Sequence, residues 1–184
     1  MEQRINNLTG WGIFLTALTV YTLTLEPTLS LWDCGEFLTS AYKLEINHSP
    51  GAPLFMLIGR LFSLLSFGNP TKAAFFINMV SAVSSAATIL FLYWTIVWLI
   101  SKLEQKHGKS YPLILKFGAA AIGALSFAFT DSFWFSAVEA EVYALSSLFS
   151  AVVLWAATRW EREADKPNSA RWILLISFLI GLSI

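Results

Sequence analysis

The sequence predicts an all-α, polytopic membrane protein built as a bundle of transmembrane helices. Hydrophobic residues make up 56% of the 184 residues, and the mean hydropathy is +0.62. Charged residues make up only 13%, where soluble domains carry roughly 25%. The apolar residues also occur in long runs, so the surplus apolar surface has to face lipid. This composition excludes a soluble domain, a disordered chain and a disulfide-stabilised scaffold.

The charge balance and the single cysteine narrow the function classes further. Twelve Lys and Arg residues balance twelve Asp and Glu residues, so we expect no basic surface and no nucleic-acid partner. Cys34 is the only cysteine, which excludes an intrachain disulfide and a cysteine-based metal site. No phosphate-binding glycine loop and no metal-spaced histidine cluster occurs. We therefore expect neither a metal nor a cofactor.

Five apolar segments are predicted membrane spans, since a spanning helix needs about 20 residues. The first is longer than the apolar part of a signal peptide and has no A-x-A cleavage site, so we expect a retained anchor. The last is still apolar where the sequence stops, which suggests the N-terminal part of a longer membrane domain. The predicted spans are residues 8–25, 73–101, 113–130, 138–158 and 172–184.

Residues 54–67 are apolar but too short to cross a membrane. A helix of this length reaches about 21 Å, against about 30 Å of hydrocarbon, and Arg60 lies in its middle. If this segment stays on the surface, nine of the twelve cationic residues fall on one side, as the positive-inside rule requires. These nine are Arg4, Lys102, Lys106, Lys109, Lys116, Arg159, Arg162, Lys166 and Arg171. We therefore expect an interfacial helix in an outer loop of residues 26–72, within one domain of residues 1–184.

The outer loop also predicts an amphipathic helix over residues 31–45, lying on the membrane surface. Ser30 and Asp33 fit the S-x-x-[DE] pattern of a helix start. Asp33 and Glu36 are three residues apart, so both carboxylates point the same way. Two interpretations stay open. Either the acids only stabilise the helix N-terminus, or one of them is a catalytic carboxylate whose pKa differs from that of its neighbour.

His48 and Arg60 are the further candidates in this loop. His48 begins the turn H-S-P-G-A-P, about 12 residues after the two acids and on the same predicted side. A lone histidine is either structural or functional, and both interpretations stay open here. Arg60 either extends toward the lipid headgroups or holds a lipid phosphate.

A second outer site is predicted after residues 131–137, which we expect to form a short aromatic turn. Glu139 and Glu141 then begin the next span, where ionisable residues are costly and suggest a function. On a helix, two residues apart means about 200° of rotation. We therefore expect at most one of the two in a cavity, with Tyr143 on the face of Glu139. The alternative is that one of them favours the helix N-terminus.

Three motifs in this order resemble one known family. They are W-D-C-G-E at residues 32–36, H-S-P-G-A-P at residues 48–53 and E-A-E-V-Y at residues 139–143. Over essentially its whole length, the chain resembles a family of multi-pass membrane proteins, common in Bacteroidetes, that includes the animal O-mannosyltransferase of plexins. That family is similar to the GT-C glycosyltransferases. The resemblance therefore implies a GT-C-like helix bundle with juxtamembrane helices in its first outer loop.

The resemblance also implies an activity and its residues. Such an enzyme transfers a mannose-like sugar from a polyprenyl-phosphate donor to a hydroxyl acceptor, on a protein or a glycan, at the outer face. The expected location is a bacterial inner membrane with a periplasmic active face, and membrane lipids are further partners. Asp33 is implied as the catalytic base, with Glu36 as the alternative. The implied substrate-binding residues are His48, Arg60, Glu139, Glu141 and Tyr143.

Two other functions remain as alternatives. A non-catalytic scaffold or assembly subunit would use its acids only to stabilise helix ends and contact headgroups. A proton-coupled transporter needs acids near the bilayer centre, whereas here they lie at the predicted edges. Convergence of Asp33, Glu36 and His48 with one of Glu139 and Glu141 around an outer cavity favours the enzyme, and scattering favours the scaffold.

Overall fold

The fold of this protein, in a computed structural model that describes residues 1–49 and 51–183, consists of helices. This part of the chain contains no strand, which confirms the predicted all-α class. Pro50 of the H-S-P-G-A-P motif and Ile184 of the last predicted span lie outside the described residues. The helices are α1 (Glu2–Leu23), α2 (Cys34–Lys43), α3 (Pro53–Ser63), the 3₁₀ helix η1 (Leu64–Ser66), α4 (Pro70–His107), α5 (Leu113–Ala128), α6 (Asp131–Ala137), α7 (Val142–Glu163) and α8 (Ala170–Leu182).

Helices α4 and α7 are long and apolar enough to cross a membrane. Helices α5 and α6 meet the same criterion only as a pair, with a bend of 71° between them. Helix α8 has 13 residues, and α1 has the length but carries several Asn, Thr and Gly residues that lower its hydropathy. The protein is therefore a membrane protein with two or three spans by this criterion, and spans at residues 8–25 and 172–184 stay predictions.

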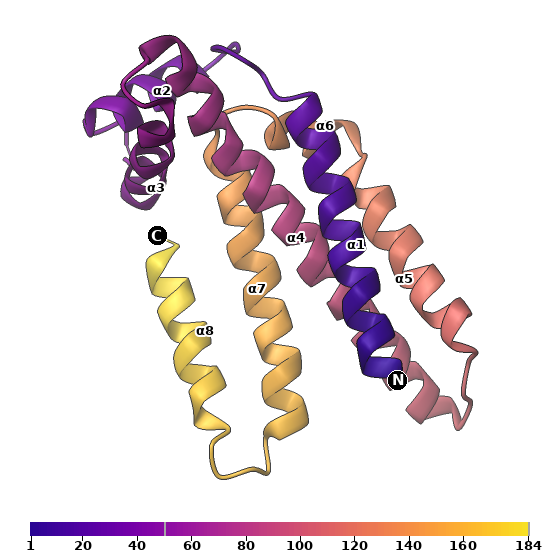
Figure 1. The fold of residues 1–184 in the computed structure, drawn as a ribbon. Helices are drawn as coiled ribbons and strands as arrows, with labels where there is room; N and C mark the ends of the chain where they lie inside the picture. Colours follow the sequence, from indigo (N-terminus) through magenta and orange to yellow (C-terminus); the bar gives the residue numbers. More distant parts are fainter. Residues whose placement is uncertain (50, 184) are drawn as a thin grey trace.

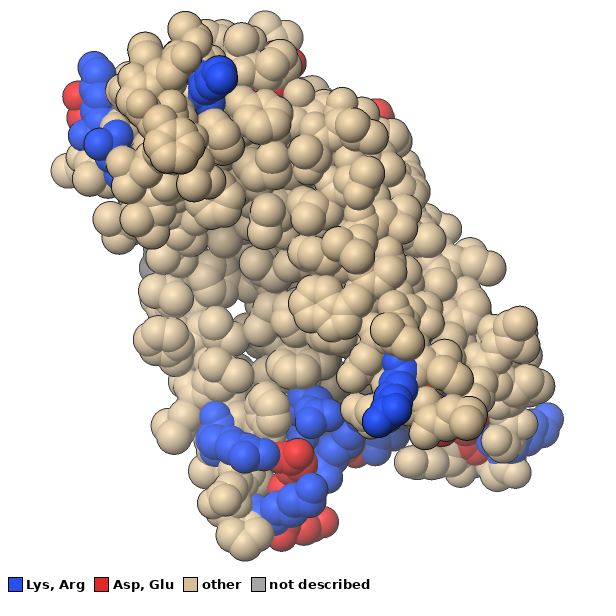
Figure 2. Space-filling model, viewed as in Figure 1, with Lys and Arg blue, Asp and Glu red and all other residues tan. Residues whose placement is uncertain are grey.

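The long helices run side by side, and the short ones gather at one end (Figure 1). We call this the α2 end, because it carries α2, α3 and α6. The opposite end, which we call the N-terminal end, carries the N-terminus and the α4–α5 and α7–α8 connections. In Figure 2, charged side chains gather at the two ends and leave an uncharged band between them. This distribution is typical of a helix bundle whose middle faces lipid.

Helix α4 lies at the centre of the bundle and packs against α1, α5 and α7. Its buried face carries small residues such as Ser81, Ser85 and Ala86, which let neighbouring helices approach closely. Helix α1 contributes Ile13 and Tyr21, which lie eight residues apart on its buried face. Small side chains therefore decide how closely the long helices pack.

A second core joins α2 and α3 to α4 at the α2 end. Phe37 of α2 packs edge-on against Phe55 of α3, with ring centroids 5.6 Å apart, and Ile77 of α4 lies in the same buried cluster. Residues 54–67, predicted as an interfacial helix, form most of α3 and all of η1 and remain at this end of the bundle (Figure 1). The two predicted outer sites therefore lie at the same end.

Gly59 marks a close approach of α3 to α2. A Cβ atom at this position would lie 2.9 Å from the Cβ of Ala41 and 3.4 Å from the Cγ2 of Ile77. Both neighbours are buried, so the helices have to separate to accept it. We expect Gly59→Ala to lower the free energy of unfolding by about 1–3 kcal/mol, the usual cost of overpacking.

Thermal unfolding followed by circular dichroism in detergent measures this effect. Gly118→Ala in α5 is the control, because a Cβ atom there meets nothing within 4 Å. We expect this control to leave stability unchanged or to raise it slightly, since alanine is the better helix former. Equal losses in the two variants would contradict the close approach at Gly59.

Candidate functional site

The loop between α1 and α2 is held against the segment that follows α6. The backbone N–H of Glu26 donates to the carbonyl of Val138 at 3.0 Å. From α4, the fully buried amide of Asn78 donates to the carbonyls of Glu26 at 2.7 Å and Thr28 at 3.0 Å. Two segments more than a hundred residues apart are thereby joined at the α2 end.

Helix α2 begins at Cys34, three residues later than predicted, and the expected capping box is wrong. The Ser30 hydroxyl donates to the carboxylate of Glu139 instead of capping the helix. Asp33 occupies the N-cap position without a side-chain cap hydrogen bond, and it is exposed. The preceding residue, Trp32, has a φ of 62°, which is rare for a bulky residue, and it is 86% exposed. The Asp33 carboxylate is therefore not used in starting the helix.

Glu139 and Glu141 precede α7, because this helix begins at Val142 and not at residue 138. No helix therefore turns these two side chains about 200° apart. Both side chains are enclosed, with only 4% of Glu139 and 7% of Glu141 exposed, and neither is among the described residues that line the cavity beside α2. Tyr143 does not share their environment. It is 64% exposed and lines a groove between α4, α5 and α7.

Burial makes these two carboxyl groups weaker acids. It raises the pKa of Glu139, although the hydrogen bond from Ser30 opposes the shift. Burial also raises the pKa of Glu141, and the charges of Glu139 and Asp33 raise it further. The charge of His48 acts on Glu141 in the opposite direction. Asp33 and His48, from the first outer site, therefore lie within electrostatic reach of Glu141, from the second.

Glu36 holds the loop that follows α2 through His48. Its Oε1 accepts a hydrogen bond from the backbone N–H of His48 at 2.8 Å, and its Oε2 lies 3.0 Å from the His48 Nδ1. Phe37 lies against the imidazole, with ring centroids 5.8 Å apart. The hydrogen bond between the two side chains lowers the pKa of Glu36 and raises that of His48. Glu36 thus positions the loop, whereas the Asp33 carboxylate makes no hydrogen bond to the described residues.

The Glu36–His48 pair predicts a measurable titration. We expect His48 to titrate above its ordinary pKa of 6.5, and we expect Glu36→Gln to return it toward that value. The contribution of His48 to stability is complete below pH 6.5 and is lost as the pH rises through the raised pKa. The contribution of Glu36 is complete above pH 4.5 and is lost as the pH falls through its lowered pKa.

NMR of the imidazole Cε1–H resonances against pH measures both values. The chain has two histidines, so a His107→Gln variant assigns the His48 resonance. An unchanged His48 pKa in Glu36→Gln would contradict the ion pair.

We call Asp33, Glu36, Glu139 and Glu141, together with His48, the acidic cluster. The Glu36–His48 contact and mutual charge effects link its members at the α2 end, whereas Arg60 and Tyr143, the other predicted site residues, lie outside the cluster. Among the described residues, no three His, Cys, Asp or Glu side chains are arranged as ligands of one metal ion.

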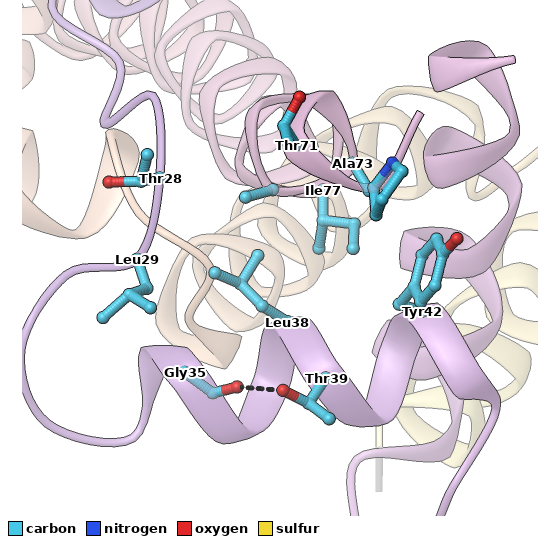
Figure 3. Close-up of a pocket in the computed structure, with 11 residues that line it drawn as sticks. Thr28, Leu29, Gly35, Leu38, Thr39, Tyr42, Thr71, Ala73 and Ile77 are labelled. Atoms are coloured by element: carbon cyan, nitrogen blue, oxygen red, sulfur yellow. Dashed lines mark hydrogen bonds between the residues drawn. The ribbon is translucent and has the colours of Figure 1, made fainter. Parts of the chain in front are cut away.

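A cavity of about 410 Å³ borders the acidic cluster without containing it. It lies between the α1–α2 loop, α2 and the start of α4. Figure 3 shows Thr28 and Leu29 on one side and Tyr42 on the other, with Leu38 and Ile77 between them. None of the predicted site residues is among the described residues that line it. The structure therefore brings the acids together but places them beside this cavity.

Arg60 reaches the wall of this cavity and not the acidic cluster. Its Nη1 donates to the carbonyl of Tyr42 at 2.7 Å, and its guanidinium lies 5.5 Å from the centre of the Tyr42 ring. His48, in contrast, contacts Glu36 and Phe37 nearer the start of α2. Arg60 and His48 thus contact different parts of α2.

Sequence reasoning missed the structural parts played by Asn78 and Ser30. A signal for Asn78 was present, because a lone amide in an apolar segment is costly unless it is paired. Cys34 is fully buried beside Ala140, and burial raises the pKa of its thiol. No local signal pairs Ser30 with Glu139, since 109 residues separate them.

Comparison with known proteins shows a match to one protein family. The family described as "Protein O-mannosyl-transferase TMEM260 N-terminal domain" matches residues 33–184. The protein O-mannosyl-transferase tmem260 of Dictyostelium discoideum is 24% identical over 164 residues, which cover 87% of this chain and 18% of that protein. The protein O-mannosyl-transferase TMEM260 of Mus musculus is 28% identical over 174 residues, which cover 94% of this chain and 22% of that protein. The chain thus spans about a fifth of the length of these relatives. No solved structure matches.

Proposed function

The chain belongs to the TMEM260 N-terminal domain family, and we propose that it carries the acidic site of a membrane protein O-mannosyltransferase. The reaction is the transfer of mannose from a polyprenyl-phosphate donor to a Ser or Thr hydroxyl of a protein, in a GT-C-type fold. The location is a bacterial inner membrane, with the α2 end in the periplasm. The nine cationic residues assigned to the inner side support this orientation, because they all belong to the N-terminal end.

The convergence of the acidic cluster is the observation that carries this proposal. A glycosyl transfer to a hydroxyl needs one carboxylate that is ionised and accessible. Asp33 is exposed at the start of α2 and makes no hydrogen bond to the described residues. Glu139 and Glu141 are buried, and burial raises the pKa of both carboxyl groups. The site thus contains carboxyl groups in two different environments, as acid–base chemistry requires.

Asp33 acts as the base in this mechanism. Its carboxylate takes the proton of the acceptor hydroxyl as the oxygen attacks the anomeric carbon of the donor. The bond between that carbon and the phosphate oxygen breaks, and the polyprenyl phosphate leaves with the electron pair, so the configuration inverts. The hydrogen bond with Glu36 raises the pKa of His48, and the positive charge of its protonated form stabilises the departing phosphate.

Exposed apolar side chains beside the acidic cluster support a lipid-linked donor. Leu29, Leu31, Trp32 and Ile46 are all exposed around the start and the end of α2. An apolar surface of this kind is typical of contact with a membrane or a lipid. The adjoining cavity offers apolar walls for the donor, and Arg60 contacts Tyr42 in one of them.

Transfer of labelled mannose in membranes tests the proposal. Membranes containing the protein and matched membranes without it receive polyprenyl-phosphate mannose and a Ser/Thr-rich acceptor peptide. We expect labelled peptide only where the protein is present, and β-elimination releases the label if the linkage is to a hydroxyl. Transfer from GDP-mannose in the absence of lipid carrier would contradict the proposal that the donor is polyprenyl-phosphate mannose. No transfer from either donor would favour the scaffold interpretation.

A further inference from the structure

A second cavity, of about 280 Å³, opens at the N-terminal end of the bundle, far from the acidic cluster. Helices α1, α4 and α7 each contribute residues at helical spacing, among them Asn6, Trp94, Arg159 and Arg162. Ten described residues line this cavity, and they include two arginines and no carboxylate. A cavity lined by cations and amides, without an acid, is complementary to an anion.

Neither arginine has a carboxylate within hydrogen-bond distance among the described residues. Arg159 and Arg162 are three residues apart on α7 and therefore share a face. The carboxylate of Glu163 lies 3.9 Å from the Arg159 Nη2, beyond hydrogen-bond distance, and its other oxygen accepts hydrogen bonds from Arg171 and Trp172. The Arg159 Nε is buried and has no hydrogen-bond partner among residues 1–49 and 51–183. Both guanidinium groups thus keep donors for a ligand.

Two tryptophans hold Arg159 in place. Its guanidinium lies 5.9 Å from the ring centre of Trp155 on α7 and 5.7 Å from that of Trp172 on α8. Stacking on aromatic rings leaves the N–H edges of a guanidinium available, and these edges match the oxygens of a phosphate. The arginine is therefore positioned before any ligand arrives.

The position and size of the cavity favour a lipid as the source of the anion. Its lining combines the two arginines with tryptophans of α1, α4 and α7, and this combination is typical of a membrane interface. A volume of about 280 Å³ is at the lower limit of small-molecule sites, so it suits a headgroup phosphate better than a nucleotide sugar. Basic pockets between transmembrane helices are sites for anionic headgroups.

We propose that this cavity binds the phosphate group of an anionic membrane phospholipid of the inner leaflet. The two arginines donate to the phosphate oxygens, and the amides of α1 complete the site. The lipid then bridges α1 and α7, which stabilises the bundle at the end opposite the acidic cluster. This site does not depend on the proposed mannosyl transfer.

Native mass spectrometry of the purified protein tests the site, with phosphatidylglycerol titrated against phosphatidylcholine. We expect phosphatidylglycerol to bind preferentially and Arg162→Gln to weaken its binding about fivefold, the usual contribution of one cation near a membrane. Arg159→Gln is expected to weaken it at least as much. Lys166→Gln is the matched control, because it removes one charge from the α7–α8 connection without touching the cavity.

The outcomes described below would overturn the proposal. Arg159 packs on two tryptophans, so its loss can affect folding, and the more exposed Arg162 decides the result. Unchanged binding in Arg162→Gln, or an equal loss in Lys166→Gln, would show a diffuse surface effect and no site. Displacement of phosphatidylglycerol by an equal concentration of inorganic phosphate would show that the cavity selects free phosphate and not a lipid.

Discussion

Asp33→Asn is expected to reduce mannosyl transfer by about 10²–10⁴-fold, the usual contribution of a general base. The amide keeps the shape of the side chain but cannot accept the proton of the acceptor hydroxyl. Because the Asp33 carboxylate makes no hydrogen bond to the described residues and is exposed, we expect no loss of stability. Transfer of labelled mannose from polyprenyl-phosphate mannose measures the rate, and thermal unfolding measures the stability.

Glu45→Gln is the matched control for this variant. Glu45 is an exposed acid of the same loop, and its partner is Lys43, at 3.8 Å, outside the acidic cluster. We expect its transfer rate to equal that of the unmodified protein. A normal rate in Asp33→Asn would remove Asp33 from the role of base, and an equal loss in both variants would indicate a general effect of the loop charge.

Glu36→Ala is expected to lower the transfer rate by about 10²-fold, because displacement of a positioned group by about 1 Å has an effect of this size. Glu36 accepts two hydrogen bonds from His48, one from its backbone and one from its side chain. Without these bonds, the loop that carries His48 is released from α2. The donor phosphate then loses a positioned cation.

Glu36→Gln separates positioning by Glu36 from catalysis by it. The glutamine Oε1 still accepts the backbone hydrogen bond of His48, so we expect a rate between those of the unmodified protein and Glu36→Ala. The pH dependence provides a second readout. Since the ion pair raises the pKa of His48, the rate in Glu36→Gln is expected to fall at a lower pH than in the unmodified protein. Equal and complete losses in Glu36→Gln and Glu36→Ala would instead make Glu36 the base.

Most of the helical architecture is predictable from local patterns. The apolar segments at residues 73–101 and 113–130 correspond to α4 and α5, because long apolar runs adopt helices that satisfy their own backbone groups in lipid. The short length, the central Arg60 and the positive-inside rule indicated that residues 54–67 do not cross the bundle. The three motifs predicted the family, which the match to residues 33–184 confirms.

The errors lie where a polar side chain has a distant partner. Ser30 was predicted to cap α2, and its hydroxyl instead donates to Glu139. Glu139 and Glu141 were predicted on a helix, where they would diverge, and they lie before α7, where both are buried. For Ser30, the local capping pattern competes with a tertiary hydrogen bond to Glu139. Burying a carboxylate without a partner costs more than a helix cap contributes.

The sequence by itself determined that this protein lies in a membrane, that it is helical and to which family it belongs. These properties depend on composition, on hydrophobic periodicity and on short motifs. Only the tertiary structure decided which polar groups meet. The acidic cluster combines residues 33–48 with residues 139–141, and the arginine cavity combines α1, α4 and α7. Such pairings arise because buried polar groups have to find partners across the packed helices, and periodicity along the chain carries no information about those partners.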